Sequence, residues 1–285
     1  MTLRQNARTI QTALALAMAL SAPAASWAGV ADAYYERAFV MAADRRCDLF
    51  EPRVKAALTA ATLQAQGAAR RAGVSVADLA ATRARAERRA GSTACGHTDL
   101  AVVRRRVDQA YAGWARTPRM TFAGIAKAWR ADRYDSRAVG WRLVQSSTFG
   151  ASVASFGSTA HREAPLTAVV SFAGRPRPYA ARLTMRDPAR TPRPWLAAPG
   201  SMPAGLQASV WSTGSSIADK GLVEPGRRGG EAWTFPASTA RRLASLDPRE
   251  SFAIEFHFRD GTVATARFEV GDFAAARAFV AMGPA

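Results

Sequence analysis

Apolar residues recur three and four positions apart through the first half of the chain, which is the spacing of one face of an α-helix. The pattern stops at Gly73 and begins again after Ser75, a residue type that caps helix N-termini. Pro52 stands where a helix can start, because the first turn does not need its missing N–H. Four helices are therefore expected, at residues 31–46, 52–72, 76–89 and 99–114.

From about Arg137 the pattern changes to short β-branched and aromatic runs separated by Gly and Pro, which are typical of strands. Strands are expected at residues 139–148, 166–173, 179–185, 206–213, 232–235 and 252–258. Short helices are expected among them at residues 237–246 and 272–282, the second capped by Asp272.

The last hairpin has the clearest register. Its first strand alternates apolar and polar residues over 252–258, and a Gly-containing turn follows. A two-residue loop would set Phe256 opposite Thr265, whereas a three-residue loop, 259–261, sets it opposite Ala264 and produces one apolar face. We therefore predict the three-residue loop, with its glycine in the left-handed conformation. We also expect the last helix to pack on the apolar face of this hairpin.

These elements predict an α+β protein in which an N-terminal helical bundle, tied by a disulfide, precedes a small antiparallel β-rich domain with a C-terminal helix. The expected divisions are residues 1–28 as a cleaved signal peptide, 29–130 as the helical domain and 137–285 as the β-rich domain. Much of the 48% hydrophobic content is Ala, which buries little area per residue. Two compact cores are therefore expected rather than one large core.

The N-terminal segment has the pattern of a secretory signal peptide. Arg4 and Arg8 precede an apolar run over residues 12–20, and Ser26 and Ala28 supply the small residues of a cleavage site. An uncleaved membrane anchor is the alternative, but the run is shorter than the roughly 20 residues that a spanning helix needs. The sequence predicts a bacterial protein that is periplasmic or secreted and has no membrane span after cleavage.

Cys47 and Cys95 are the only cysteines among the 285 residues. In an exported chain a pair of cysteines indicates a disulfide, and this one would join the end of the first helix to the start of the fourth. A metal site is the alternative, because His97 follows Cys95 closely and Asp44 and Asp48 flank Cys47. The Cys-x-x-Cys pairs typical of zinc sites are absent, so we expect the disulfide, with no metal and no cofactor.

The chain carries a formal net charge of +17, with the excess concentrated between residues 29 and 150. A GC-rich genome would favour Arg and Ala whatever the function, yet a positive field still attracts anions. The expected partners are lipid head groups, lipopolysaccharide or another envelope protein, and no physiological nucleic acid. The densest basic clusters are candidate anion-binding residues, with a solvated helix face as the alternative. They are Arg85, Arg88, Arg89, Arg104, Arg105 and Arg106.

Catalytic motifs are scarce. The sequence has no Gly-x-Ser-x-Gly, no P-loop and no His-Glu-x-x-His. Ser158, His161 and Glu163 include the side chains of a triad, but groups so close in one loop rarely reach triad geometry. We therefore expect a non-catalytic envelope protein, and the alternative is a small exported hydrolase whose site is assembled from distant residues with His161 as base. Trp195, in a Pro-rich loop at 188–203, is either a binding contact or an anchor of its loop.

Overall fold

The computed structural model describes residues 27–136, 140–161 and 164–285. The expected signal peptide lies outside these ranges apart from its last two residues, which begin the first helix. None of the helices in the described ranges combines the length and the hydropathy that crossing a membrane requires.

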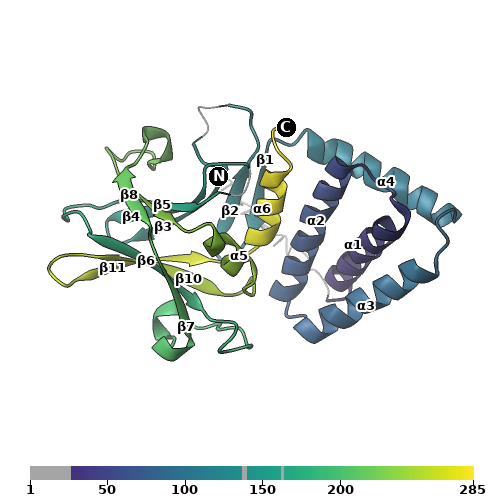
Figure 1. Ribbon diagram of the computed structural model, residues 1–285, viewed down its shortest axis with the longest axis horizontal. Coiled ribbons are helices and arrows are strands. Elements are labelled where there is room, and N and C mark those ends of the chain that lie inside the picture. The colour runs from purple at the N-terminus through teal and green to yellow at the C-terminus, as the bar shows by residue number, and fades with distance from the viewer. Residues whose placement is uncertain (1–26, 137–139, 162–163) are drawn as a thin grey trace, which may run out of the picture.

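The N-terminal part is helical, as the spacing predicts, and forms the right-hand half of the molecule in Figure 1. Its helix α1 packs against both α2 and α3, and α4 packs against α2. Ser75 caps α3, because its hydroxyl accepts a hydrogen bond of 3.0 Å from the N–H of Asp78, and Pro52 occupies the first turn of α2. The four helices are α1 (Trp27–Cys47), α2 (Pro52–Arg71), α3 (Val76–Ser92) and α4 (Thr98–Ala115).

A disulfide joins Cys47, the last residue of α1, to Cys95 in the segment before α4. Their Cα atoms lie 5.5 Å apart, within the usual range for such a bond. The helical part of the molecule is therefore tied at the point where the chain passes from α3 to α4.

The rest of the described chain forms two antiparallel sheets. The larger sheet has the strand order β1-β2-β3-β4-β5-β9-β8, and the smaller has the order β11-β10-β6-β7. The larger sheet consists of β1 (Arg119–Ala123), β2 (Ala128–Asp132), β3 (Leu143–Phe149), β4 (Ser152–Ser158), β5 (Leu166–Ser171), β9 (Glu231–Phe235) and β8 (Gly214–Ile217). The smaller consists of β11 (Val263–Glu269), β10 (Ser251–His257), β6 (Ala180–Arg186) and β7 (Gln207–Trp211). Short helices complete the fold: η1 (Pro199–Ser201), η2 (Ala204–Leu206), η3 (Lys220–Leu222), α5 (Ser238–Ala244) and α6 (Phe273–Ala281).

The α+β architecture is confirmed, but the strands begin earlier than expected. The last helix of the N-terminal group ends at Ala115. Strand β1 and the start of β2 lie within the stretch that the sequence assigned to the helical domain, up to residue 130. Both strands belong to the larger sheet, where β2 pairs with β3. The central strand β4 was also not predicted, because Ser and Gly supply much of its sequence and dilute its apolar alternation.

The register of the last hairpin is confirmed. Phe256 lies opposite Ala264 and Phe252 lies opposite Phe268, and Gly261 has a φ of 82°. The expected packing of the terminal helix on this hairpin is wrong. The apolar face of the hairpin instead contacts the larger sheet, where the ring of Phe156 lies 5.4 Å from that of Phe252 and 5.6 Å from that of Phe268.

Helix α6 packs against α2 and across β1 and β2 instead. Its Phe279 ring lies 5.6 Å from that of Phe122 on β1. The expected cap by Asp272 is also absent, because the Asp272 carboxylate is bound by the guanidinium of Arg71 at the end of α2. The C-terminal helix is therefore the layer through which the helices meet the sheets.

A polar clamp aligns the two sheets. The side chain of Gln145 on β3 accepts a hydrogen bond from the N–H of Glu269 (2.7 Å) and donates one to its carbonyl oxygen (3.2 Å). Gln145 therefore makes with β11 the pair of bonds that a neighbouring strand would make.

A buried ion pair joins the two halves of the molecule. Arg70, at the end of α2, donates from Nε to Asp247 (3.0 Å), and both side chains are almost fully buried. Asp247 also accepts hydrogen bonds from the backbone and side chain of Arg249. Although burial raises the pKa of the Asp247 carboxyl, these hydrogen bonds outweigh it and hold the pKa below its usual value.

The lowered pKa of Asp247 predicts a loss of stability in acid. In the window between the folded and unfolded pKa values, the unfolded state binds more protons, so the free energy of unfolding falls as the pH is lowered from about 4 through the folded pKa. We expect Asp247→Asn to show a smaller fall than the wild type between about pH 5 and about pH 3 in urea denaturation. Asp219→Asn, at an exposed position, serves as the control and should keep the wild-type slope. An unchanged slope in Asp247→Asn would contradict the prediction.

Candidate functional site

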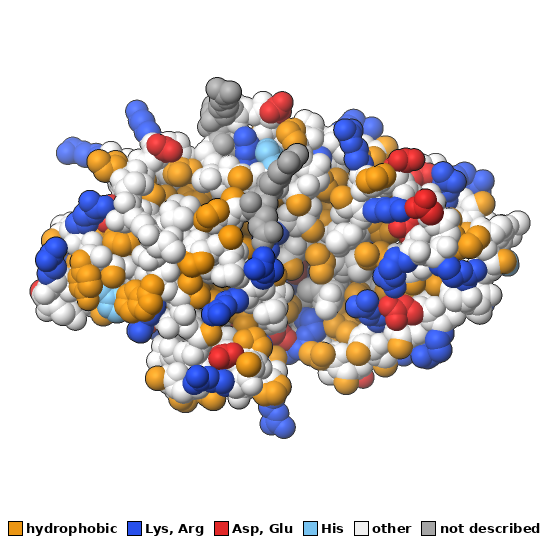
Figure 2. Space-filling model, in the orientation of Figure 1, with side chains coloured by type: hydrophobic (Ala, Val, Ile, Leu, Met, Phe, Trp, Pro, Cys, Tyr) orange, Lys and Arg blue, Asp and Glu red, His pale blue; other side chains and the backbone are white. Residues whose placement is uncertain are grey.

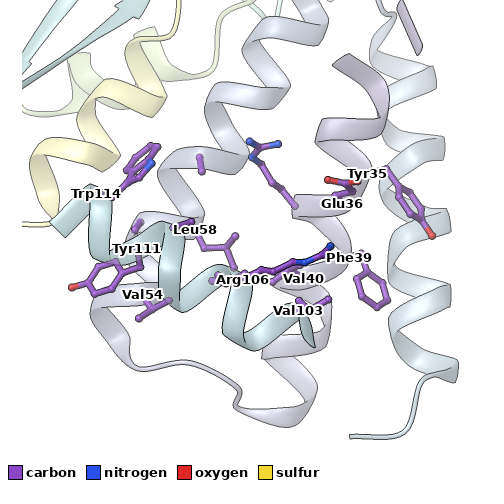
Figure 3. A pocket seen from close by; sticks show the side chains of 15 residues that line it. Tyr35, Glu36, Phe39, Val40, Val54, Leu58, Val103, Arg106, Tyr111 and Trp114 are labelled. Atoms are coloured by element: carbon purple, nitrogen blue, oxygen red, sulfur yellow. The ribbon is translucent and has the colours of Figure 1, made fainter. Parts of the chain in front are cut away.

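An apolar cavity lies in the helical half, between α1, α2 and α4 (Figure 3). Its volume of about 470 Å³ is within the range of about 300–1,000 Å³ that small-ligand pockets have. Aliphatic and aromatic side chains from the three helices line most of it. They include Phe39, Val40, Val54, Leu58, Val103, Val107, Tyr111 and Trp114.

Helix α4 forms one wall of the cavity and is fixed near both of its ends. The disulfide ties the chain just before α4, and near its other end Trp114 packs edge-on against Phe279 of α6, with 5.8 Å between ring centroids. Between these points, Leu100 is the one residue of α4 that is buried. The later apolar positions Val103 and Val107 are half-buried. They pack against a buried cluster that includes Val40 and Val54, and they also line the cavity.

Three charged residues border this apolar space. Figure 3 shows Arg106 reaching from α4 toward Val40 on α1, with Glu36 beyond it. Within the described part of the chain, the side chain of Arg106 has neither an ion-pair partner nor a hydrogen bond. Arg37, which also lines the cavity, donates to the carbonyl oxygen of Ala33 (2.8 Å). The site therefore combines an apolar interior with an unpaired guanidinium, an arrangement suited to a molecule with an apolar chain and an anionic end.

The six predicted anion-binding arginines are all exposed, and one of them reaches the cavity. Figure 2 shows Lys and Arg side chains interleaved with Asp and Glu over the helical half on the right. Arg85 donates to the hydroxyl of Thr82 (3.0 Å), within α3 itself. The cavity was not predicted from the sequence, because the spacing of the α4 stripe is the same whether its side chains fill a core or line a gap. On α3 lie Arg85, Arg88 and Arg89; on α4 lie Arg104, Arg105 and the cavity-lining Arg106.

His161, the candidate base of the hydrolase alternative, lies in a small pocket of about 40 Å³ that Ser158 also lines. Its Nδ1 atom is buried without a hydrogen-bond partner among the described residues. Burial, followed by the positive charge of Arg142, lowers the pKa of His161. The hydroxyl of Ser158 bonds to the backbone of Ala160, and Glu163 lies outside the described residues.

Trp195, the other aromatic noted in the sequence, is half-buried in the loop between β6 and β7. Its backbone N–H donates to the carboxylate of Glu250 (3.0 Å), which also binds Arg186 in a buried ion pair. These bonds attach the loop to the end of β6. Across the described ranges, no group of three or more His, Cys, Asp or Glu side chains lies close enough to hold a metal ion.

Comparisons of the chain with protein-family models, with curated proteins and with solved structures find no match. The geometry of the molecule and the chemistry of its surfaces are therefore the basis on which its function is proposed.

Proposed function

We propose that this protein is an exported, non-catalytic component of the bacterial envelope that binds an anionic lipid through its helical half. The observation that carries the proposal is the apolar cavity between α1, α2 and α4, with the unpaired guanidinium of Arg106 in its wall. The net charge of +17 and the signal-peptide pattern of the first 28 residues support the same proposal.

In the proposed complex an acyl chain occupies the cavity and the head group faces Arg106. Burial of a hydrocarbon chain against the apolar lining supplies most of the affinity, at about 25 cal/mol per Å² of apolar surface removed from water. The guanidinium of Arg106 can bind a phosphate through two parallel hydrogen bonds. The cavity lining carries two positive charges, from Arg37 and Arg106, and one negative charge, from Glu36. Its net charge of +1 favours a head group with a single negative charge.

A single-chain lipid tests the cavity without the complication of a membrane surface. We expect the mature protein, isolated from the periplasmic fraction, to have the mass of a chain that begins at Gly29. In titration calorimetry it should bind lysophosphatidylglycerol more tightly than lysophosphatidylcholine. Arg106→Gln should weaken binding of the anionic lipid about tenfold, because one charged hydrogen-bond pair contributes about 1.5–3 kcal/mol. Arg85→Gln is the matched control, since Arg85 is exposed on α3 and does not line the cavity.

A second variant separates the cavity from the surface charge. Val107→Asp places a carboxylate among the apolar lining and should abolish binding of both lipids, whereas a merely electrostatic surface would bind almost as before. Equal binding of the two lipids, or an equal loss in Arg85→Gln and Arg106→Gln, would overturn the proposal.

A further inference from the structure

The outer face of the smaller sheet carries an ordered row of chemically different side chains. Trp211 on β7 lies opposite Arg182 on β6, Arg182 lies opposite Glu255 on β10, and Glu255 lies opposite Thr265 on β11. Because residues directly opposite one another point to the same side of a sheet, these four side chains cross the whole sheet on one face. This is the face opposite to the Phe-rich side that packs on the larger sheet.

Two large aromatic residues on this face are exposed to solvent. Trp211 is 50% exposed and Tyr179, just before β6, is 59% exposed. The ring of His257 is close to both, with its centroid 5.3 Å from that of Trp211 and 6.4 Å from that of Tyr179. Exposed aromatic residues in such a group commonly mark a binding site.

Polar neighbours hold these rings in place. The guanidinium of Arg182 lies 5.3 Å from the ring centroid of Trp211 and is bonded to the carboxylate of Glu255 through Nε (2.9 Å). The Nε2 atom of His257 is buried and has no hydrogen-bond partner among the described residues, with Glu255 Oε2 3.6 Å away. A ligand on this face would therefore meet rings that are already positioned.

The two ends of the face differ. Toward Arg186, Thr184 and Ala253 are buried, and η1 packs on β10 there. Toward Tyr179, the face is open. The covered end therefore forms a boundary beside the open part, so that a ligand is limited to the half that holds Trp211, Tyr179 and His257.

The chemistry of the open half fits a sugar better than a lipid or an ion. The apolar C–H face of a pyranose ring stacks on aromatic rings, while its hydroxyl groups exchange hydrogen bonds with side chains that both donate and accept. Arg182 and Glu255 neutralise one another in their ion pair, so the centre of the face does not select a charged ligand. A lipid would need a larger aliphatic surface than the open half offers, where Val263 is the exposed aliphatic side chain.

We propose that the open half of this face binds a neutral oligosaccharide of pyranose units. Trp211 and Tyr179 stack on sugar rings, and Arg182 and Glu255 bond to hydroxyl groups. The site is separate from the lipid cavity in the helices and does not depend on it.

The test uses saturation-transfer NMR and titration calorimetry of the full mature protein with cellotetraose, maltotetraose and chitotetraose. At least one of the three is expected to bind, and Trp211→Ala and Tyr179→Ala are each expected to weaken that binding about tenfold or more. Tyr134→Ala removes a tyrosine of similar exposure, 43%, elsewhere on the surface and should leave binding unchanged. Glu255→Gln, which keeps the size of the side chain, should also weaken binding, because it breaks the ion pair with Arg182.

Three results would overturn the proposal. The first is no binding of any of the three sugars at millimolar concentration, and the second is binding that Trp211→Ala leaves intact while thermal unfolding shows the variant to be folded. The third is self-association of the wild type that Trp211→Ala abolishes in sedimentation velocity, since a second copy of the chain would then cover this face. Arg106→Gln should bind the sugar as the wild type does, so failure of the lipid proposal leaves this one standing.

Discussion

Replacing Asp247 with Ala is expected to lower the free energy of unfolding by about 3–5 kcal/mol, because it leaves a buried guanidinium without its counter-ion. The side chain of Arg70 is 8% exposed and that of Asp247 is 4% exposed, so water cannot replace the lost carboxylate. Arg70 would retain its hydrogen bond to the carbonyl oxygen of Val74. The measurement is urea denaturation followed by circular dichroism.

Two further variants determine how the loss arises. Arg249→Ala removes the more exposed partner of Asp247 and should cost less than about 1 kcal/mol. The double variant Arg70→Met, Asp247→Leu replaces the ion pair with apolar groups and should recover most of the lost stability. If Asp247→Ala costs no more than Arg249→Ala, the pair does not hold the helices to the sheets.

The double variant Cys47→Ser, Cys95→Ser is expected to lower the free energy of unfolding by about 4 kcal/mol, since the bond spans a sequence separation of 48 residues. The effect falls mainly on the unfolded chain, which loses a constraint. In the folded state, Arg46 also ties the end of α1 to this region, through bonds to the carbonyl oxygens of Ala90, Gly91 and Thr93.

The measurement compares urea midpoints with and without reductant. The wild type should lose stability in reductant and approach the midpoint of the serine variant, whose own midpoint should be the same in both conditions. The prediction fails if the oxidised wild type and the serine variant share one midpoint. Because the disulfide holds the start of α4, the serine variant is also expected to bind lysophosphatidylglycerol more weakly.

The elements that the sequence predicts well are those in which one arrangement alone buries the apolar residues. In the last hairpin, a shift of one residue would move Phe252 and Phe256 to the solvent side, so the register follows from the alternation. The disulfide was predictable for another reason: in a chain whose first residues have the pattern of an export signal, two cysteines have one possible partner each.

The contacts between distant segments could not be predicted in the same way. The apolar stripe of α6 shows that the helix is covered, but not that α2 and β1 cover it rather than the hairpin next to it in sequence. Arg70 and Asp247 are 177 residues apart, and nothing in the surroundings of either one identifies the other. Strand β4 was missed partly because it contains Gly157, a residue type that is uncommon in strands. Only glycine fits at that position, since a Cβ atom there would lie 1.7 Å from the carbonyl oxygen of Leu143.

The candidate site was predicted only in part, for the same reason. The arginines of α4 were identified by their density, and the apolar positions of α4 by their period. That Arg106 and Val107 line one cavity depends on how far α4 stands from α1, which a single helix does not encode. The aromatic group on the smaller sheet likewise joins residues from three separate strands or strand ends.

The Gln145 clamp has a consequence for the exchange of parts between proteins. Hydrophobic layers can slide over one another at little cost, but a donor and an acceptor on one side chain permit a single alignment. Since the clamp bonds to the backbone of position 269, any residue with an N–H could stand there and complete it, and Pro could not. A transplanted hairpin would therefore keep the clamp with any residue except Pro at this position, whereas the bonds from the N–H groups of residues 125–127 need the carboxylate of Glu269 itself.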